Sequence, residues 1–466
     1  MRPQTGFRPG YGPSLRNQST GNRGGSGGAS AIGFVPVRKP PWLAWALWDC
    51  GATGLNAITI TFVFSVYLTA SVGASAGTSA ASWLGRAMAV AGIAVALLAP
   101  LTGSAITEPS RRRRALIVLS LTVAGLTASM SLIRNDPSYL WPGLVLLAVT
   151  AASSDLATVP YNATLRLVTT PQNAGRVSGF GLAAGYLGSV ALLLMVYVGF
   201  VAGQGPTVGV LGLPTADGVN VRAAMLLTAA WFLVFALPLL RAKPQSTDGP
   251  AVDVPQVAPG GFRQLRADLV GEWRRDRNIV YYLLASAVFR DGLTGVVAFG
   301  AVLGVNVYGI SAANVLLFGV TASTLAAVGA ALGGLLDERI GAKAVILGSL
   351  ASMIVVGLVL LALSGPLTFW VCGLLLSLFV GPTQSSARTL LLRMSPAGKE
   401  GLSFGLYTTT GRAATFLAPT LFFTFVDLFG ADRAGLGGLL VVLAAGLIAM
   451  LPIRDSAPQS ELLERR

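Results

Sequence analysis

The chain has 466 residues, of which 53% are hydrophobic and only 11% are charged, whereas soluble domains carry about 25% charged residues. This composition excludes an ordinary soluble protein and predicts a polytopic membrane protein. The formal net charge is +14, but the basic residues lie in short connections between apolar runs, so we expect contacts with lipid headgroups and no nucleic-acid binding. With two cysteines and no histidine, the sequence argues against a disulfide framework, a zinc centre and Ser–His or Cys–His catalysis.

The N-terminal region, residues 1–40, is rich in Gly, Ser, Asn and Arg and lacks the apolar stretch of a signal peptide. Its composition predicts a disordered cytoplasmic tail. Beyond this region, apolar windows recur that are long enough for a helix to cross a bilayer, which takes about 20 residues. The twelve windows cover approximately 42–70, 81–106, 115–133, 139–163, 177–201, 221–240, 279–305, 314–336, 343–365, 368–388, 402–427 and 435–453.

A polar segment divides these windows into two sets of six. Residues 241–278 begin as a Pro- and Gly-rich linker and continue with apolar and charged residues at helical spacing, which is typical of a helix on the membrane surface. The predicted organisation is therefore a six-helix bundle over 41–240, a cytoplasmic linker over 241–278, a second six-helix bundle over 279–453 and a cytoplasmic tail over 454–466.

Lysine and arginine are distributed unevenly between the predicted loops. With the N-terminus inside, most of them face the cytoplasm, and only Arg134, Arg222 and Arg433 lie in outer loops. The positive-inside rule then predicts that both termini and the linker are cytoplasmic. We expect a multi-pass protein of the plasma (inner) membrane.

The two sets of spans resemble each other at corresponding positions. Asp49 in span one precedes a Gly-Ala-Thr-Gly group, and Asp291 in span seven precedes Gly-Leu-Thr-Gly. Spans five and eleven each carry two glycines six residues apart, namely Gly179 with Gly185 and Gly405 with Gly411. These matches suggest a duplicated six-helix unit, and transporters built in this way bind their substrate between the two halves, near the midplane of the bilayer.

The loop between spans eight and nine, GGLLDERIGAK, is similar to the cytoplasmic signature of the major facilitator superfamily. The matching residues are Gly333, Asp337, Arg339, Gly341 and Lys343. Three further stretches resemble the "unknown major facilitator" family, which includes the autophagy-related vacuolar amino-acid effluxer. They lie in span one, in the connection between spans four and five, and in span eleven. The stretches that carry this resemblance are WALWDCGATGLNAITITFVFSVYL, YNATLRLVTTPQNAGRVSGFGLAAGYLG and SFGLYTTTGRAATFLAPTLF.

The resemblance extends over residues 42–453 and implies an all-α membrane protein with twelve transmembrane helices in two pseudo-symmetric six-helix bundles. It also implies export of small solutes, with amino acids as the best-known case, along a path lined by spans one, four, seven and ten. The chain departs from the family pattern in three places. Ala52-Thr53 replaces an Asn-Ser pair, Arg290 replaces a small amide, and Thr107-Glu108 stands where an aspartate is expected.

Acidic residues lie within three of the four path-lining spans, Asp49 in span one, Asp155 in span four and Asp291 in span seven. An ionised acid at the centre of a membrane helix costs roughly 2.5–3.5 kcal/mol, so it tends to face a water-filled cavity or pair with a base. Asp49 and Asp155 are expected at similar depths and could meet. The candidate substrate- and ion-binding residues, chosen as polar neighbours at helical spacing or in spans ten and eleven, are Asp49, Thr53, Asn56, Asp155, Asn162, Asp291, Thr294, Gln384 and Arg412.

The same acids also admit a structural interpretation, in which they pair with Arg86, Arg290 or Arg412 or cap broken helices. Arg412 lies near the midplane, where it could bridge to an acid in span seven or ten or could provide a counter-charge for an anionic group of the substrate. The signature residues are predicted to latch the cytoplasmic helix ends in the outward-facing state, together with Arg176 and Arg111–Arg114. The alternative is that these charges are topology signals alone.

The sequence lacks a Walker-type ATP-binding loop, so an ion gradient is the expected source of energy. We predict a proton-coupled secondary transporter that exports a small polar solute such as an amino acid by alternating access, with H⁺ favoured over Na⁺ as the coupling ion. The protein is expected to be a monomer without enzymatic activity, cofactor or bound metal. The alternatives are a sugar:cation symporter of the melibiose type, a lipid flippase and a membrane protein that transports nothing.

Overall fold

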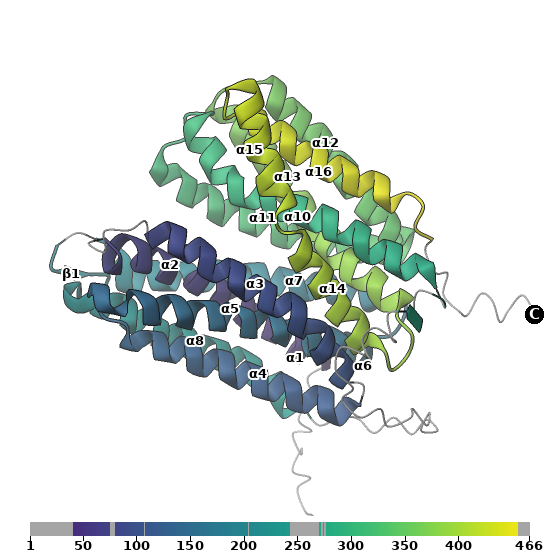
Figure 1. Ribbon diagram of the computed structural model, residues 1–466, viewed down its shortest axis with the longest axis horizontal. Coiled ribbons are helices and arrows are strands. Elements are labelled where there is room, and N and C mark those ends of the chain that lie inside the picture. The colour runs from purple at the N-terminus through teal and green to yellow at the C-terminus, as the bar shows by residue number, and fades with distance from the viewer. Residues whose placement is uncertain are drawn as a thin grey trace, which may run out of the picture. The chain divides into compact units, whose positions relative to one another are not determined.

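The computed structural model describes residues 41–74, 80–106, 108–203, 205–242, 270–271, 274 and 276–454. The predicted N-terminal tail, most of the predicted linker and nearly all of the predicted C-terminal tail lie outside the described residues. The described part is almost entirely helical (Figure 1). It contains 11 helical segments long and apolar enough to cross a membrane and a shorter apolar helix, Ala434–Met450, which together confirm the twelve predicted spans.

Helices of the first six spans form one group in Figure 1, coloured from purple to teal. Their regular parts are α1 (Pro41–Asn56), α2 (Phe64–Tyr67), α3 (Ala80–Ala105), α4 (Pro109–Ser129), α5 (Leu140–Ala163), α7 (Ala174–Val196) and α8 (Val219–Arg241). The short helix α6 (Leu165–Val168) follows α5. Between α7 and α8, strands β1 (Thr207–Val208) and β2 (Leu213–Pro214) pair as a small antiparallel hairpin, which the sequence did not predict.

Helices of the last six spans form the second group, coloured green to yellow (Figure 1). They are α10 (Arg277–Asn306), α11 (Ala312–Ile340), α12 (Ala342–Ala362), α13 (Pro366–Met394), α14 (Glu400–Ala414), α15 (Leu417–Phe429) and α16 (Ala434–Met450). Helices α14 and α15 together make span eleven. The arrangement is the twelve-helix fold of the major facilitator superfamily, as the sequence predicts.

Spans one and eleven are interrupted. Span one passes through two π-helical segments, Ala57–Phe62 and Leu68–Val72, and span eleven breaks between α14 and α15 at Thr415 and Phe416. Irregular backbone at membrane depth is tolerated where it is buried in protein or lines a cavity. The break in span eleven is therefore expected to be buried or to line a cavity.

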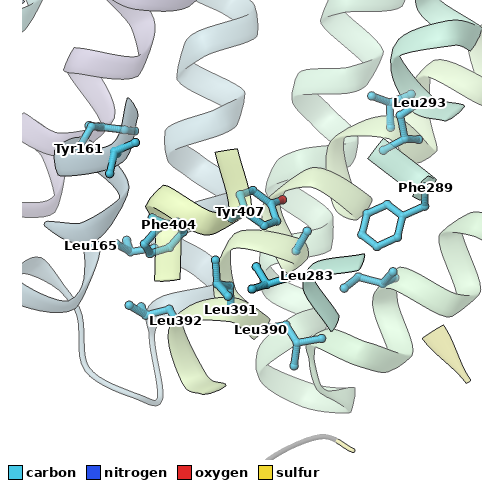
Figure 2. Close-up of a cluster of buried hydrophobic side chains, with 14 of the residues drawn as sticks. Tyr161, Leu165, Leu283, Phe289, Leu293, Leu390, Leu391, Leu392, Phe404 and Tyr407 are labelled. Atoms are coloured by element: carbon cyan, nitrogen blue, oxygen red, sulfur yellow. The ribbon is translucent and has the colours of Figure 1, made fainter. Parts of the chain in front are cut away.

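One buried hydrophobic cluster contains side chains from both groups of spans. Figure 2 shows Tyr161 and Leu165 of the first group within the same cluster as Leu392 and Phe404 of the second. The two groups are thus held together by ordinary apolar packing as well as by the polar contacts described below.

Glycines bring helices of the two groups into close contact at two crossings. A methyl group at Gly405 of α14 would lie 2.6 Å from the carbonyl oxygen of Ala99 in α3, and one at Gly334 of α11 would lie 2.6 Å from that of Gly175 in α7. Since neither crossing has room for a side chain, the helices pack backbone against backbone there, as small residues allow in membrane proteins.

Candidate functional site

A cavity of about 390 Å³ lies between the two groups of spans. The first group contributes Asp155, Thr158, Asn162 and Leu182, and the charged residues of the second group that line it are Arg290, Asp291, Arg388 and Arg412. Six of the nine candidate residues line this cavity, namely Asp155, Asn162, Asp291, Thr294, Gln384 and Arg412. The other three, Asp49, Thr53 and Asn56, are not part of its lining.

Asp49 in α1 is buried and pairs with Arg388 in α13. Nη1 of Arg388 donates to Oδ2 of Asp49 over 3.2 Å, and the two side chains are only 11% and 12% exposed. Thr53 donates to the other carboxylate oxygen of Asp49 over 3.3 Å. Because a buried charge is stable only when it is paired and hydrogen-bonded, this contact ties the first span to the opposite half of the molecule.

Asn56 has a role within the first half. Its Oδ1 accepts a hydrogen bond of 3.0 Å from Oγ of Ser154 in α5. The bond joins spans one and four next to the interrupted part of span one.

Asp155 in α5 pairs with Arg412 in α14, through Oδ2 and Nη2. These side chains are 24% and 35% exposed and line the cavity. Of the roles considered for Arg412, the bridge to span seven or ten is not found, because its partner lies in span four. Pairing of a span acid with Arg412 is what the structural interpretation allowed. Asp49 and Asp155 do not pair with each other either, since each binds its own arginine from the second half.

Asp291 in α10 holds the broken span eleven. Its Oδ2 accepts a hydrogen bond of 2.5 Å from the backbone N–H of Ala418, in the first turn of α15. The first N–H groups of a helix lack intrahelical partners, and a carboxylate there satisfies one of them and complements the helix dipole. The structure therefore gives Asp291 the capping contact that its structural interpretation anticipated.

Arg290 precedes Asp291 and points to a different partner. Its guanidinium carbon lies 3.7 Å from the ring centroid of Tyr407, and its Nη1 donates to the carbonyl oxygen of Tyr407 over 2.8 Å. A methyl group at Gly411 would lie 2.9 Å from both terminal nitrogens of Arg290. Thr294 donates to the backbone carbonyl of Arg290 over 3.0 Å, so its hydroxyl is engaged within α10.

Gln384 connects the two halves across the cavity wall. Its Oε1 accepts a hydrogen bond of 3.4 Å from the hydroxyl of Tyr186 in α7. Asn162, on the opposite side of the lining, is buried. Both residues line the cavity, and the side-chain oxygen of Asn162 is itself buried.

The residues of the predicted signature loop lie where α11 turns into α12, and we call this end of the spans the signature end. Asp337 is buried and forms an ion pair of 2.7 Å with Arg393. A side chain at Gly333 would clash with Pro382, and Gly341 has a φ of +86°, which favours glycine. Lys343 donates to the carbonyl oxygen of Leu451 over 2.8 Å, and Arg339 is exposed.

Glu400, which the sequence analysis missed, joins the two halves at the signature end. Its side chain is 3% exposed and binds Arg112 over 3.1 Å and Arg166 over 2.8 Å. Within the predicted Arg111–Arg114 latch, only Arg112 makes this contact; Arg111 pairs with Glu108 and Arg113 donates to Leu240 O, both within the first half. Arg176 lies 3.9 Å from Glu338 of the second half.

Sequence reasoning also missed Arg388 and gave Arg290 no binding role. A charge within a predicted span was the available signal for both, and it is the same signal that selected the three aspartates. Glu400 and Arg166 lie in or beside predicted loops, where a charge is ordinary, so the sequence held no signal for them.

The family described as "Vacuole effluxer Atg22 like" matches residues 168–459 of the chain. The chain belongs to this family. Among its relatives, the uncharacterized MFS-type transporter YxiO of Bacillus subtilis (strain 168) is 23% identical over 424 residues, which cover 90% of this chain and 96% of YxiO. Autophagy-related protein 22 of Yarrowia lipolytica (strain CLIB 122 / E 150) is 24% identical over 62% of this chain and 52% of its own length.

Solved structures support the fold of this family member. The MFS transporter FucP in the outward conformation aligns with a TM-score of 0.68 at 13% identity, covering 90% of this chain and 99% of FucP. A bacterial homologue of the iron transporter ferroportin in the outward-facing state aligns with a TM-score of 0.62 at 16% identity, covering 88% and 97%. Together with the family match and the relatives, these structures support a multi-pass membrane transporter with the major facilitator fold.

Proposed function

We propose that the protein is an ion-coupled secondary transporter, with proton coupling favoured, that exports a small polar solute such as an amino acid by alternating access. The observation that carries this proposal is the cavity between the two halves, whose lining holds two aspartates and three arginines. A water-filled, charged cavity at membrane depth suits a polar solute and an ion, and it would be costly without such a role.

The contacts between the halves support a specific state in the transport cycle. The Asp155–Arg412 pair lines the cavity, Arg388 of the Asp49–Arg388 pair also lines it, and Glu400 binds Arg112 and Arg166 at the signature end. The distribution of lysine and arginine supports a cytoplasmic location of the signature end. In this proposal the structure represents an outward-facing state, and breaking these contacts opens the cytoplasmic side.

The same reasoning extends to the organisation of the chain. We propose that residues 41–240 and 279–453 rock against each other as two six-helix bundles, in a monomer of the plasma membrane with both termini cytoplasmic. The candidate binding residues are those that line the cavity. Asp49 and its neighbours Thr53 and Asn56 lie outside the lining and would act on the solute indirectly.

Proteoliposomes test the proposal directly. The protein is reconstituted with a pH-sensitive dye inside, and pools of amino acids, sugars and small drugs are added to wild type and to Asp49→Asn. The proposal predicts a proton flux that one pool triggers and the variant loses. Sodium-dependent sugar uptake would instead support the melibiose-type alternative, and folded protein without flux for any pool or ion would contradict a transport function.

A further inference from the structure

We propose that Arg290 is the anion-binding subsite of the cavity and that the transported solute carries a carboxylate group. This inference rests on the proposed function, because it names the chemistry of the solute that the same cavity binds. It assigns the counter-charge role to Arg290, whereas the sequence had pointed to Arg412.

Two charged residues of the lining, Arg290 and Asp291, form no ion pair in the part of the chain that the structure describes. The other two arginines of the lining each form an ion pair with an aspartate, and Asp291 is bound by the backbone of α15. Within the described ranges, no carboxylate forms an ion pair with Arg290, whose polar contacts are the carbonyl oxygen and the ring face of Tyr407. The guanidinium of Arg290 therefore has no carboxylate bound to it, while the carboxylate of Asp291 is held by the backbone of α15.

The position of Arg290 makes this unmatched charge significant. It lies thirteen residues after the start of α10 at Arg277, which corresponds to about 20 Å along the helix axis and thus to the middle of a span. An arginine at that depth is costly unless water or an anion compensates it. Since the cavity admits polar groups, a carboxylate on the solute would provide the missing charge.

The surroundings of Arg290 fix its guanidinium in place. Stacking on Tyr407 and the bond from Nη1 hold the planar group, and Gly411 leaves room for it where a side chain would collide. A guanidinium offers several N–H donors in a rigid fork that matches a carboxylate. With Nη1 on the Tyr407 carbonyl, the remaining donors are available for a ligand, and little conformational entropy is lost when one binds.

Binding of an anion at Arg290 would also affect the ion pair between Asp155 and Arg412, which joins the two halves. Arg290 lines the same cavity as Asp155 and its partner Arg412. An anion bound to Arg290 thus lies beside an ion pair that joins spans four and eleven, where it can compete with Asp155 for Arg412. This juxtaposition links recognition of the solute to the contact that must break when the cytoplasmic side opens.

Matched pairs of ligands test the subsite on the purified full-length protein. The melting temperature is measured with proteinogenic amino acids, small mono- and dicarboxylic acids, sugars and polyamines, and each stabilising acid is compared with its amide. We expect a carboxylate to stabilise the protein and its amide to lose the effect. Arg290→Gln should weaken binding of the carboxylate about 10- to 100-fold, the range for loss of a charge-assisted hydrogen bond, and Arg290→Lys should weaken it less.

Arg86→Gln is the matched control. Arg86 is also an arginine of a predicted span, but it is exposed and lies 4.6 Å from the Trp83 ring centroid, outside the cavity lining. It should leave binding unchanged. Stabilisation by a sugar or a polyamine alone, or a carboxylate whose affinity is the same in Arg290→Gln and wild type, would overturn the subsite and leave transport standing. If Arg290→Gln does not fold, unchanged affinity in Arg290→Lys has the same meaning.

Flux measurements separate this inference from the proposed function. Every probe is also tested for flux in proteoliposomes. If a probe without an acid group drives flux, the transporter stands and the carboxylate subsite falls. If folded protein neither binds nor transports any probe, both fall together.

Discussion

Spans one and seven occupy corresponding places in the two halves, yet they use their acids differently. Asp49 binds an arginine across the interface between the halves, whereas Asp291 binds the backbone of its own half. The glycines that face them differ in the same way, because Gly185 makes room beside Thr53 and Asp49, whereas Gly411 makes room beside Arg290. The pattern of acid and glycine is therefore repeated in both halves, but the contacts differ. In the first half Asp49 forms an ion pair with Arg388 of the second half. In the second half Arg290 forms no ion pair with a carboxylate of the described residues.

The largest effect on stability and transport is expected from breaking the ion pair between Asp49 and Arg388. Asp49→Asn leaves Arg388 buried without its partner, and loss of one member of a buried pair costs about 3–5 kcal/mol. We expect a strongly lowered melting temperature and loss of transport for this variant and for Arg388→Gln. The double variant removes both charges and should melt above either single variant. A double variant that melts below both would show that the two residues do not act as a pair.

A smaller effect on stability is expected at the signature end, where Glu400 forms ion pairs with Arg112 and Arg166 of the other half. Glu400→Gln keeps the shape but removes the charge between Arg112 and Arg166, which weakens charge-assisted bonds that contribute about 1.5–3 kcal/mol each. Hydrogen exchange of the backbone over residues 400–407 should become at least several-fold faster.

Glu108→Gln provides the control for this measurement. Glu108 also binds an arginine, Arg111, but within its own half and with both side chains about half exposed, so the exchange rates should not change. Equal exchange in Glu400→Gln and Glu108→Gln would contradict a role of Glu400 in closing the signature end.

Substitution of Asp291 should impair stability and transport less than substitution of Asp49, its counterpart in span one. Asparagine retains an oxygen that accepts the bond from Ala418, so Asp291→Asn should retain most transport, whereas Asp291→Ala should lose about 1 kcal/mol of stability, as typical for a lost helix cap. Transport by both variants, measured beside Asp49→Asn, checks the contrast. If Asp291→Asn abolishes transport without lowering the melting temperature, Asp291 contacts the solute or the ion directly.

The smallest stability change is expected at the facing glycines. Gly411→Ala places a methyl group 2.9 Å from the flexible end of Arg290, which should displace the guanidinium and raise the KM for a carboxylate solute with little effect on folding. Gly185→Ala presses on Thr53 instead and should leave the preference for acid over amide unchanged. The ratio of the two KM values for an acid and its amide reports the difference, and an equal ratio in both variants would remove Gly411 from the account of specificity.

The sequence predicts the twelve spans well because each must contain enough apolar residues to cross the bilayer. It also places most candidate residues on the cavity, since an intramembrane polar group needs water or a partner. It offered Arg412 as one possible partner of the acids but could not select Asp155, because helical periodicity gives the face of a residue and not the helix that faces it. The break at Thr415 and Phe416 lies just before Pro419, which has no N–H for the carbonyl of Thr415. The sequence therefore carried a signal for the break, but none for the cap by Asp291.

The most direct measurement is a cryo-electron microscopy map of the protein with the solute that triggers flux in proteoliposomes. The central claim is that this solute binds between the two halves with its carboxylate on Arg290. We expect density in the cavity within hydrogen-bond distance of the Arg290 guanidinium and beside the Asp155–Arg412 pair. Solute density elsewhere, for example in the apolar pocket lined by Phe62, Leu193 and Val315, would contradict it.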